Sequence, residues 1–112
     1  MRAAYQAFAR RDLHQLGLLV NDDITVEWDL PDGAPSTNGR NELLNRLSGL
    51  VHATDGTATA ELLELQCANT GRLVANHREI AVVERRPVHR LGRLRIDLDG
   101  GRIQLVTHLP PT

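Results

Sequence analysis

Residues 4–28 read AYQAFARRDLHQLGLLVNDDITVEW, and this stretch decides the fold. The segment from Arg2 to Arg11 favours a helix whose apolar side chains lie along one stripe, namely Ala4, Tyr5, Phe8 and Ala9. Asp12 can accept hydrogen bonds from the first free N–H groups of a second helix, and Gln15 can complete a capping box. This second helix buries leucines together with Val20, and Asn21 ends it. The break at Asp12 predicts a helical hairpin.

Residues 24–30 alternate with a period of two, which predicts a half-buried strand. One face carries Ile24, Val26, Trp28 and Leu30, and the other carries Thr25, Glu27 and Asp29. Trp28 is therefore expected to point inward, while the two carboxylates share the opposite face. They do not form an acid/base pair around the tryptophan.

The remainder of the chain predicts one more helix and then strands only. The segment PDGAPSTNG is a loop by composition, and Asn38 is expected to cap a helix over 39–51. Strand-like segments follow, separated by turn signals, at 57–68, 72–84, 88–98 and 102–109. This order predicts a single α+β domain over residues 1–112, in which three N-terminal helices pack on the concave side of a curved, mostly antiparallel sheet.

Composition excludes several classes of protein. The chain is 41 % hydrophobic and carries a net charge of −1, which argues against a dedicated nucleic-acid binder. No apolar run approaches the roughly 18 residues of a membrane span. Cys67 is the only cysteine, so a cytoplasmic location is expected, with Cys67 as a small buried residue. The five histidines show no metal-binding spacing, and the arginines of the 85–95 segment are interpreted as a solvated rim.

The order of these motifs resembles the nuclear transport factor 2-like superfamily. The helical hairpin, the DDITVEW strand, the NGRNELLNRL helix and the final hairpin LRIDLDGGRIQLVTHLP all have counterparts there. Relatives usually begin several residues earlier, so the first helix is expected to be clipped or unusually short. The resemblance implies a cone-shaped sheet around a pocket closed by the helices, commonly in a homodimer. Members include SnoaL-like polyketide cyclases, ketosteroid isomerases, epoxide hydrolases and non-catalytic binding domains, so the fold does not give the function.

The catalytic residues of the isomerase relatives are missing. Their general base aligns with Trp28, and their oxyanion-hole Asp and Tyr align near Leu94 and at Ala4. SnoaL-like cyclases place an acid/base Asp five residues after the hairpin isoleucine, and here that position is His108. A histidine can still transfer protons there, because its ordinary pKa lies near 6.5.

The direction of His108 depends on the register of the last hairpin. A two-residue GG loop pairs Leu98 with Ile103 and turns His108 outward, whereas a three-residue DGG loop pairs Leu98 with Arg102 and turns it inward. The family comparison favours the inward direction and the hydrophobic pattern favours the outward one.

The other candidate site residues are His77, Tyr5 and Phe8. His77 and Glu79 are two residues apart on one strand face, where they can act as base and orienting group or form a pair at a dimer or solvent face. Tyr5 either donates its hydroxyl hydrogen to a ligand carbonyl or is a core residue.

The sequence thus predicts a protein that binds a small hydrophobic organic molecule without a cofactor or metal. The catalytic candidates are His108 and His77, in a cyclase, isomerase or hydrolase acting on a polyketide- or terpenoid-like substrate. Trp28, Tyr5 and Phe8 are the expected substrate-binding residues. The alternative is a non-catalytic ligand-binding or dimerisation domain of the same fold.

Overall fold

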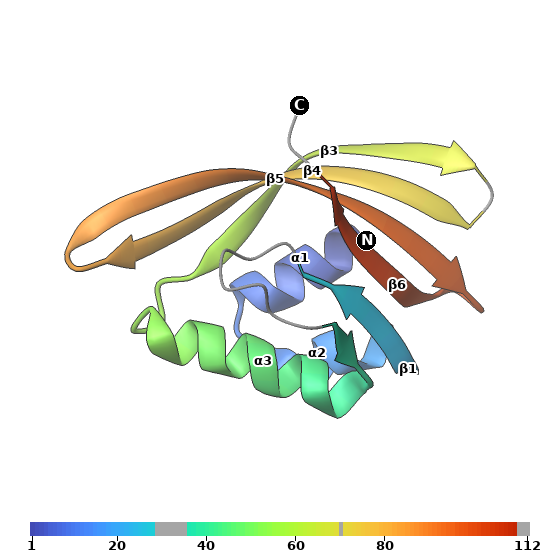
Figure 1. Ribbon diagram of the computed structural model, residues 1–112, viewed down its shortest axis with the longest axis horizontal. Coiled ribbons are helices and arrows are strands. Elements are labelled where there is room, and N and C mark those ends of the chain that lie inside the picture. The colour runs from blue at the N-terminus through green and yellow to red at the C-terminus, as the bar shows by residue number, and fades with distance from the viewer. Residues whose placement is uncertain (29–35, 70, 110–112) are drawn as a thin grey trace.

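The computed structural model describes residues 1–28, 36–69 and 71–109, and Figure 1 shows their arrangement. The helices in these ranges are α1 (Arg2–Ala9), α2 (Leu13–Leu18) and α3 (Arg40–Ala53). The strands are β1 (Val20–Glu27), β2 (Thr37–Asn38), β3 (Thr59–Asn69), β4 (Arg72–Val83), β5 (Arg86–Asp99) and β6 (Arg102–Leu109). The predicted α+β class and the predicted long strands are confirmed.

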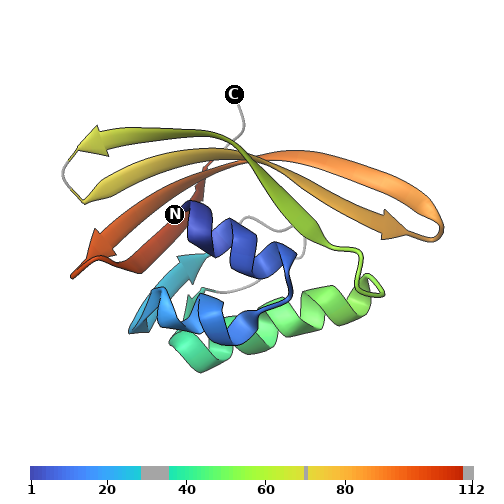
Figure 2. The ribbon, with the colours of Figure 1, turned by 180° about the vertical axis from the view of Figure 1, so that it is seen from behind.

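The described strands form one curved sheet in the order β2-β1-β6-β5-β4-β3. Neighbouring strands are antiparallel except β1 and β6, which are parallel. The three helices lie together on the concave face of this sheet, as Figures 1 and 2 show from opposite sides. Strands β2 and β3 are the two edges of the described sheet, so the sheet is open and does not close into a barrel.

The helix starts confirm one predicted cap and correct another. The Asp12 carboxylate accepts a hydrogen bond from the backbone N–H of Gln15 at 3.0 Å, as expected for an N-cap. Asn38 does not cap α3, because it belongs to β2 and pairs with Thr25 of β1. The cap residue is Gly39, whose φ of +93° is a conformation that glycine adopts without strain.

The predicted positions of Val20 and Cys67 are both corrected by the strands that contain them. Val20 was expected on the second helix, but it begins β1, because the carbonyl of Leu19 accepts a hydrogen bond from the backbone N–H of Ile103. Cys67 was expected to be buried and is exposed, because it lies on the edge strand β3. The predicted strand end at Leu30 and the outward placement of Asp29 concern residues outside the described ranges.

The hairpin between β5 and β6 contains a β-bulge that neither predicted register includes. Its loop is the two-residue Gly100–Gly101 turn, so Leu98 pairs with Ile103. The next pair joins Asp97 to Leu105, which leaves Gln104 without a partner in the ladder. One extra residue reverses the alternation of side chains beyond it. His108 therefore lies on the same face as Leu94, with which it pairs, and that face is the inner one.

The side chain of Gln104 ties this bulge to β1. Its Oε1 accepts a hydrogen bond from Asn21 Nδ2 at 2.7 Å, and its Nε2 donates one to the carbonyl oxygen of Asp23 at 3.3 Å. The β1–β6 pairing also changes register between Val20 and Thr25. The two irregularities lie side by side. The Gln104 side chain at the bulge of β6 therefore bonds the backbone of β1 where β1 leaves the regular ladder.

The core lies between the sheet and the helices. Its buried apolar residues come from every layer: Ala4, Ala7, Leu16, Val20, Ile24, Val26, Leu43, Ala75, Leu94, Ile96 and Ile103. No helix within residues 1–28, 36–69 and 71–109 is long and apolar enough to cross a membrane.

Candidate functional site

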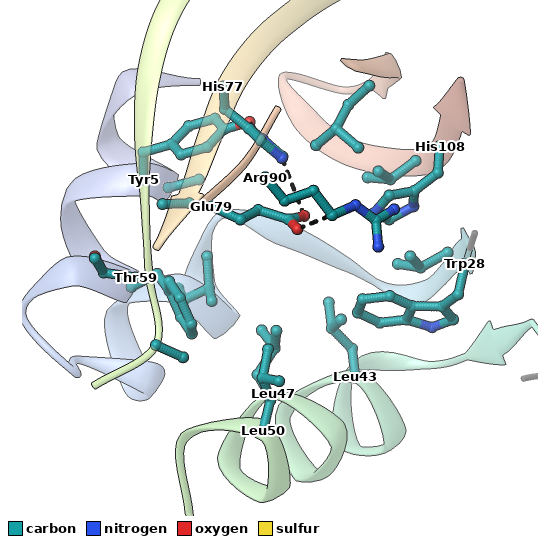
Figure 3. A pocket seen from close by; sticks show the side chains of 18 of the residues that line it. Tyr5, Trp28, Leu43, Leu47, Leu50, Thr59, His77, Glu79, Arg90 and His108 are labelled. Carbon is teal, nitrogen blue, oxygen red and sulfur yellow. Dashed lines mark hydrogen bonds and ion pairs between the residues drawn. The ribbon is translucent and has the colours of Figure 1, made fainter. Parts of the chain in front are cut away.

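A cavity of about 360 Å³ lies between the concave face of the sheet and the helices. All five residues selected from the sequence, His108, His77, Trp28, Tyr5 and Phe8, line it. In Figure 3 His77, Glu79, Arg90 and His108 extend from the sheet, and Leu43, Leu47 and Leu50 face them from α3. The cavity is therefore a mainly apolar chamber whose charged and imidazole groups come from the sheet.

His108 is held in one orientation by two contacts with β1. Its Nδ1 lies 2.9 Å from the carbonyl oxygen of Glu27, and a carbonyl oxygen only accepts, so Nδ1 carries the hydrogen. Its ring stacks on the indole of Trp28, with 5.4 Å between ring centroids and 27° between the planes. Nδ1 is thus committed to the backbone, and Nε2 is the ring nitrogen that can exchange a proton with a ligand.

Trp28 is itself fixed on two further sides. Its indole Nε1 donates a hydrogen bond to the hydroxyl of Thr37, which is buried. The guanidinium of Arg46 lies 4.8 Å from the indole centroid. A cation over an aromatic ring is attracted by the electron density of its face. Trp28 is therefore a rigid end wall of the cavity against which His108 rests.

Burial lowers the pKa of His108, and this effect exceeds the opposing hydrogen bond to Glu27. The side chain is then the neutral, proton-accepting form at neutral pH. We expect the fluorescence of Trp28, the only tryptophan, to report the protonation of the stacked imidazole with a midpoint below about 6.5. A fluorescence titration measures it, and His108→Gln should abolish the transition. A midpoint above the ordinary histidine value would contradict the burial argument.

The lowered pKa of His108 also predicts how the folding stability depends on pH. The unfolded chain binds a proton at His108 near pH 6.5, while the folded chain does not until lower pH. This contribution to stability is therefore present above about pH 6.5 and is lost as the pH falls toward the folded-state pKa.

A second group of polar side chains lies along β4 and α1. His77, which is only 4 % exposed, has its Nε2 3.2 Å from Glu79 Oε1 and its Nδ1 2.6 Å from the hydroxyl oxygen of Tyr5. The hydrogen bond from His77 is the main reason why the pKa of Glu79 is lowered. Glu79 Oε2 in turn lies 3.6 Å from Arg90 Nε. These four residues form a connected row, which is called the relay below.

Burial, with a smaller contribution from the charge of Glu79, raises the pKa of Tyr5 well above its ordinary value. Tyr5 is the only tyrosine, so the tyrosinate absorbance reports it alone. We expect the Tyr5 hydroxyl of the folded protein to stay protonated at about pH 10, where free tyrosine titrates. Above that pH the unfolded chain loses a proton that the folded chain keeps, so the stability should fall. Tyr5→Phe should remove this part of the fall; an ordinary Tyr5 titration in the folded protein would contradict it.

Solved structures of low sequence identity share the fold of this chain. A protein from a soil-derived mobile gene cassette superposes with a TM-score of 0.88 at 21 % identity, over 96 % of this chain and 83 % of that one. An NTF2-like protein of unknown function from Burkholderia pseudomallei superposes with a TM-score of 0.83 at 18 % identity, over 98 % and 86 %. The chain has the nuclear transport factor 2-like fold.

A third similar structure is a candidate polyketide cyclase from Xanthomonas campestris, with a TM-score of 0.78 at 19 % identity, over 98 % of this chain and 86 % of that one. No family model and no curated protein sequence matches the chain. The comparisons therefore establish the fold and leave the activity to the residues of the cavity.

The positions that the sequence resemblance placed at or near isomerase catalytic groups carry no acid or base in this chain. Ala4, Trp28 and Leu94 all line the cavity. Among the described lining residues, the titratable side chains are Tyr5, His77, Glu79, Arg90 and His108. Within the same ranges no three His, Cys, Asp or Glu side chains gather as a metal site would require.

Sequence reasoning missed two residues of β5. Arg90 was interpreted as part of a solvated rim, but it lines the cavity, because it pairs with Glu79 and shares the inward face of β5 with Leu94. Gly92 pairs with His77 and lies directly under its ring. The alternation of Val88, Arg90, Gly92 and Leu94 is the signal that could have found both.

Proposed function

We propose that this protein binds a small, largely apolar organic molecule in the cavity and catalyses proton transfer on it without a cofactor. His108 is the acid/base group. The observation that carries the proposal is the fixed orientation of His108, whose Nδ1 donates to the Glu27 carbonyl while its ring stacks on Trp28. An imidazole with a lowered pKa and an available Nε2 is a base at neutral pH.

The chemistry that fits is removal of a proton from a carbon next to a carbonyl group. The C–H electron pair forms a C=C bond, and the carbonyl oxygen becomes an enolate. If a C=C bond of the substrate is conjugated with the enolate, return of the proton from His108 to the far carbon of that bond is an isomerisation. Attack of the enolate carbon on a second carbonyl of the same molecule, with the proton passing to the new alkoxide, is a cyclisation. Arg90 supplies a cation in the same cavity for the developing oxyanion, although Glu79 offsets part of its charge. Trp28 and Phe8 shape the space.

A second function is favoured by one observation. The sequence resemblance places Trp28, which cannot abstract a proton, at the position of the isomerase base. In this alternative the cavity serves binding alone, as in a ligand-carrying domain of the same fold. Under this reading the relay and His108 orient a bound molecule and exchange no proton with it. A homodimer and a cytoplasmic location, both expected from the sequence, also stay predictions; sedimentation equilibrium tests the dimer.

Hydrogen–deuterium exchange separates the two functions without knowledge of the natural substrate. The probe is 2-tetralone, a flat bicyclic ketone with acidic protons next to its carbonyl, incubated with the protein in D₂O. We expect exchange faster than in a solution of free imidazole at the same concentration. Quenching of Trp28 fluorescence shows whether 2-tetralone is bound. Binding without accelerated exchange would reject proton-transfer catalysis of this ketone and favour the binding domain.

A further inference from the structure

Gly92 of β5 makes room for the imidazole of His77. A Cβ atom at position 92 would lie 2.3 Å from His77 Nε2, 2.7 Å from Cδ2 and 3.3 Å from Cε1. The two shorter distances are not tolerated between non-bonded atoms, so any other residue at this position displaces the ring. The ring has little freedom to move, because it is buried and hydrogen-bonded through both nitrogens. The absence of a side chain at Gly92 is therefore a condition for the relay.

The relay has a direction that follows from its charges. The pKa of Glu79 is lowered, so its carboxylate is ionised and only accepts hydrogen bonds. His77 Nε2 must then carry the hydrogen that lies between them. In a neutral imidazole the other nitrogen, Nδ1, has the lone pair, and it accepts from the Tyr5 hydroxyl at 2.6 Å. The raised pKa of Tyr5 is consistent with a phenol that keeps its proton as the donor.

The direction of the relay decides what Tyr5 offers to a ligand. A phenol has one hydrogen, and in this arrangement that hydrogen is directed to His77. The Tyr5 oxygen retains a lone pair that can accept a hydrogen bond. Tyr5 lines the cavity, so this lone pair belongs to the ligand-binding space. The interpretation of Tyr5 as a donor to a ligand carbonyl requires the same hydrogen, which Tyr5 already donates to His77.

We propose that the Tyr5 end of the cavity selects a ligand hydroxyl, which donates its hydrogen to Tyr5, over a ligand carbonyl or ether. Tyr5 determines this specificity, and Gly92 is a positioning residue that acts through His77. The proposal rests on ligand binding in the cavity, as in the proposed function, and not on catalysis by His108. It adds to that function an apolar molecule with a free alcohol or phenol group as the ligand class.

The first test measures the tautomer of His77 in the unmodified protein. Long-range nitrogen–proton NMR correlations at about pH 8, above the ordinary titration range of imidazole, distinguish a hydrogen on Nε2 from one on Nδ1. We expect His77 to carry its hydrogen on Nε2. A hydrogen on Nδ1 would make Tyr5 the acceptor from His77 and would overturn the proposal, whatever ligand is later found.

The second test compares 2-naphthol with 2-methoxynaphthalene by calorimetry. Both have the same apolar rings, but only the naphthol can donate. We expect the folded wild-type protein to prefer 2-naphthol by about three- to tenfold, the usual worth of one hydrogen bond. Tyr5→Phe and Gly92→Ala should both reduce this preference to near unity. Equal affinities of the wild-type protein for the two compounds, or an unchanged preference in Tyr5→Phe, would overturn the proposal.

The control variant is Gly49→Ala, because Gly49 of α3 is exposed and a Cβ there would meet no atom within 4 Å. It should keep the preference for 2-naphthol. His108→Gln separates the two proposals. Loss of tetralone exchange with an intact naphthol preference supports both, whereas unchanged exchange with an intact preference rejects only the catalytic role of His108.

Discussion

Replacing His108 by glutamine is expected to slow proton transfer to the bound ketone by about 10²–10⁴-fold, the usual contribution of a general acid/base. Glutamine keeps a side chain of similar length and can donate to the Glu27 carbonyl, so the end wall formed by Trp28 should survive. It has no basic nitrogen, so the chemical step loses its proton acceptor. The measurement is the rate of 2-tetralone exchange in D₂O at saturating ketone.

His89→Gln is the matched control for this variant. His89 lies on β5, where it is exposed, and it points away from the cavity because it alternates with Arg90. Its loss should leave the exchange rate within about twofold, as for other surface substitutions. An equal effect of the two substitutions, or no effect of His108→Gln, would remove His108 from the mechanism and favour the binding-domain alternative.

Ile96→Ala is expected to destabilise the protein by about 2–5 kcal/mol, the range measured when a fully buried aliphatic side chain is cut back to alanine. Ile96 is 0 % exposed, and it pairs with Leu73 on one side and Val106 on the other. Removal of its outer carbons leaves a cavity in the middle of the sheet, where neighbouring strands cannot close in. Urea unfolding followed by circular dichroism measures the change.

Leu91→Ala on the same strand is the control. Leu91 is 57 % exposed, so truncation should change the stability by no more than about 0.5 kcal/mol. If Leu91→Ala costs as much as Ile96→Ala, then the outer face of the sheet is buried in solution. That result would contradict the placement of the core and would direct attention to an assembly that covers this face.

The arrangement of the elements was predictable because each one carries a strong local pattern. The Asp12 cap divides the first two helices, and the long C-terminal strands are separated by short turn segments, so their limits agree with the structure to within about two residues. The two-residue β2 was not predictable, because Thr37 and Asn38 lie in a segment with loop composition and pair only through their contact with β1.

The site was predictable only in part, and each failure has a physical cause. The five selected residues line the cavity, but their roles are untested. Arg90 was missed because an arginine in a run of arginines indicates solvent exposure, and only its pairing with Glu79 places it inside. Gly92 was missed because its role is the space that it leaves free, and that space is defined by His77, a residue distant in sequence.

The bulge at Gln104 has a consequence for how such proteins diverge. One extra residue in the ladder reverses the direction of every side chain that follows it. His108 therefore points into the cavity because of the number of residues between it and the hairpin turn, as well as because of their identity. Loss of a single codon between Ile103 and His108 would exchange the two faces of the strand end at once. In a relative with one residue fewer between the isoleucine and the histidine, the histidine could still align with His108, but its side chain would point to the outer face of the sheet. Spacing is thus a heritable trait of this site, separate from residue identity.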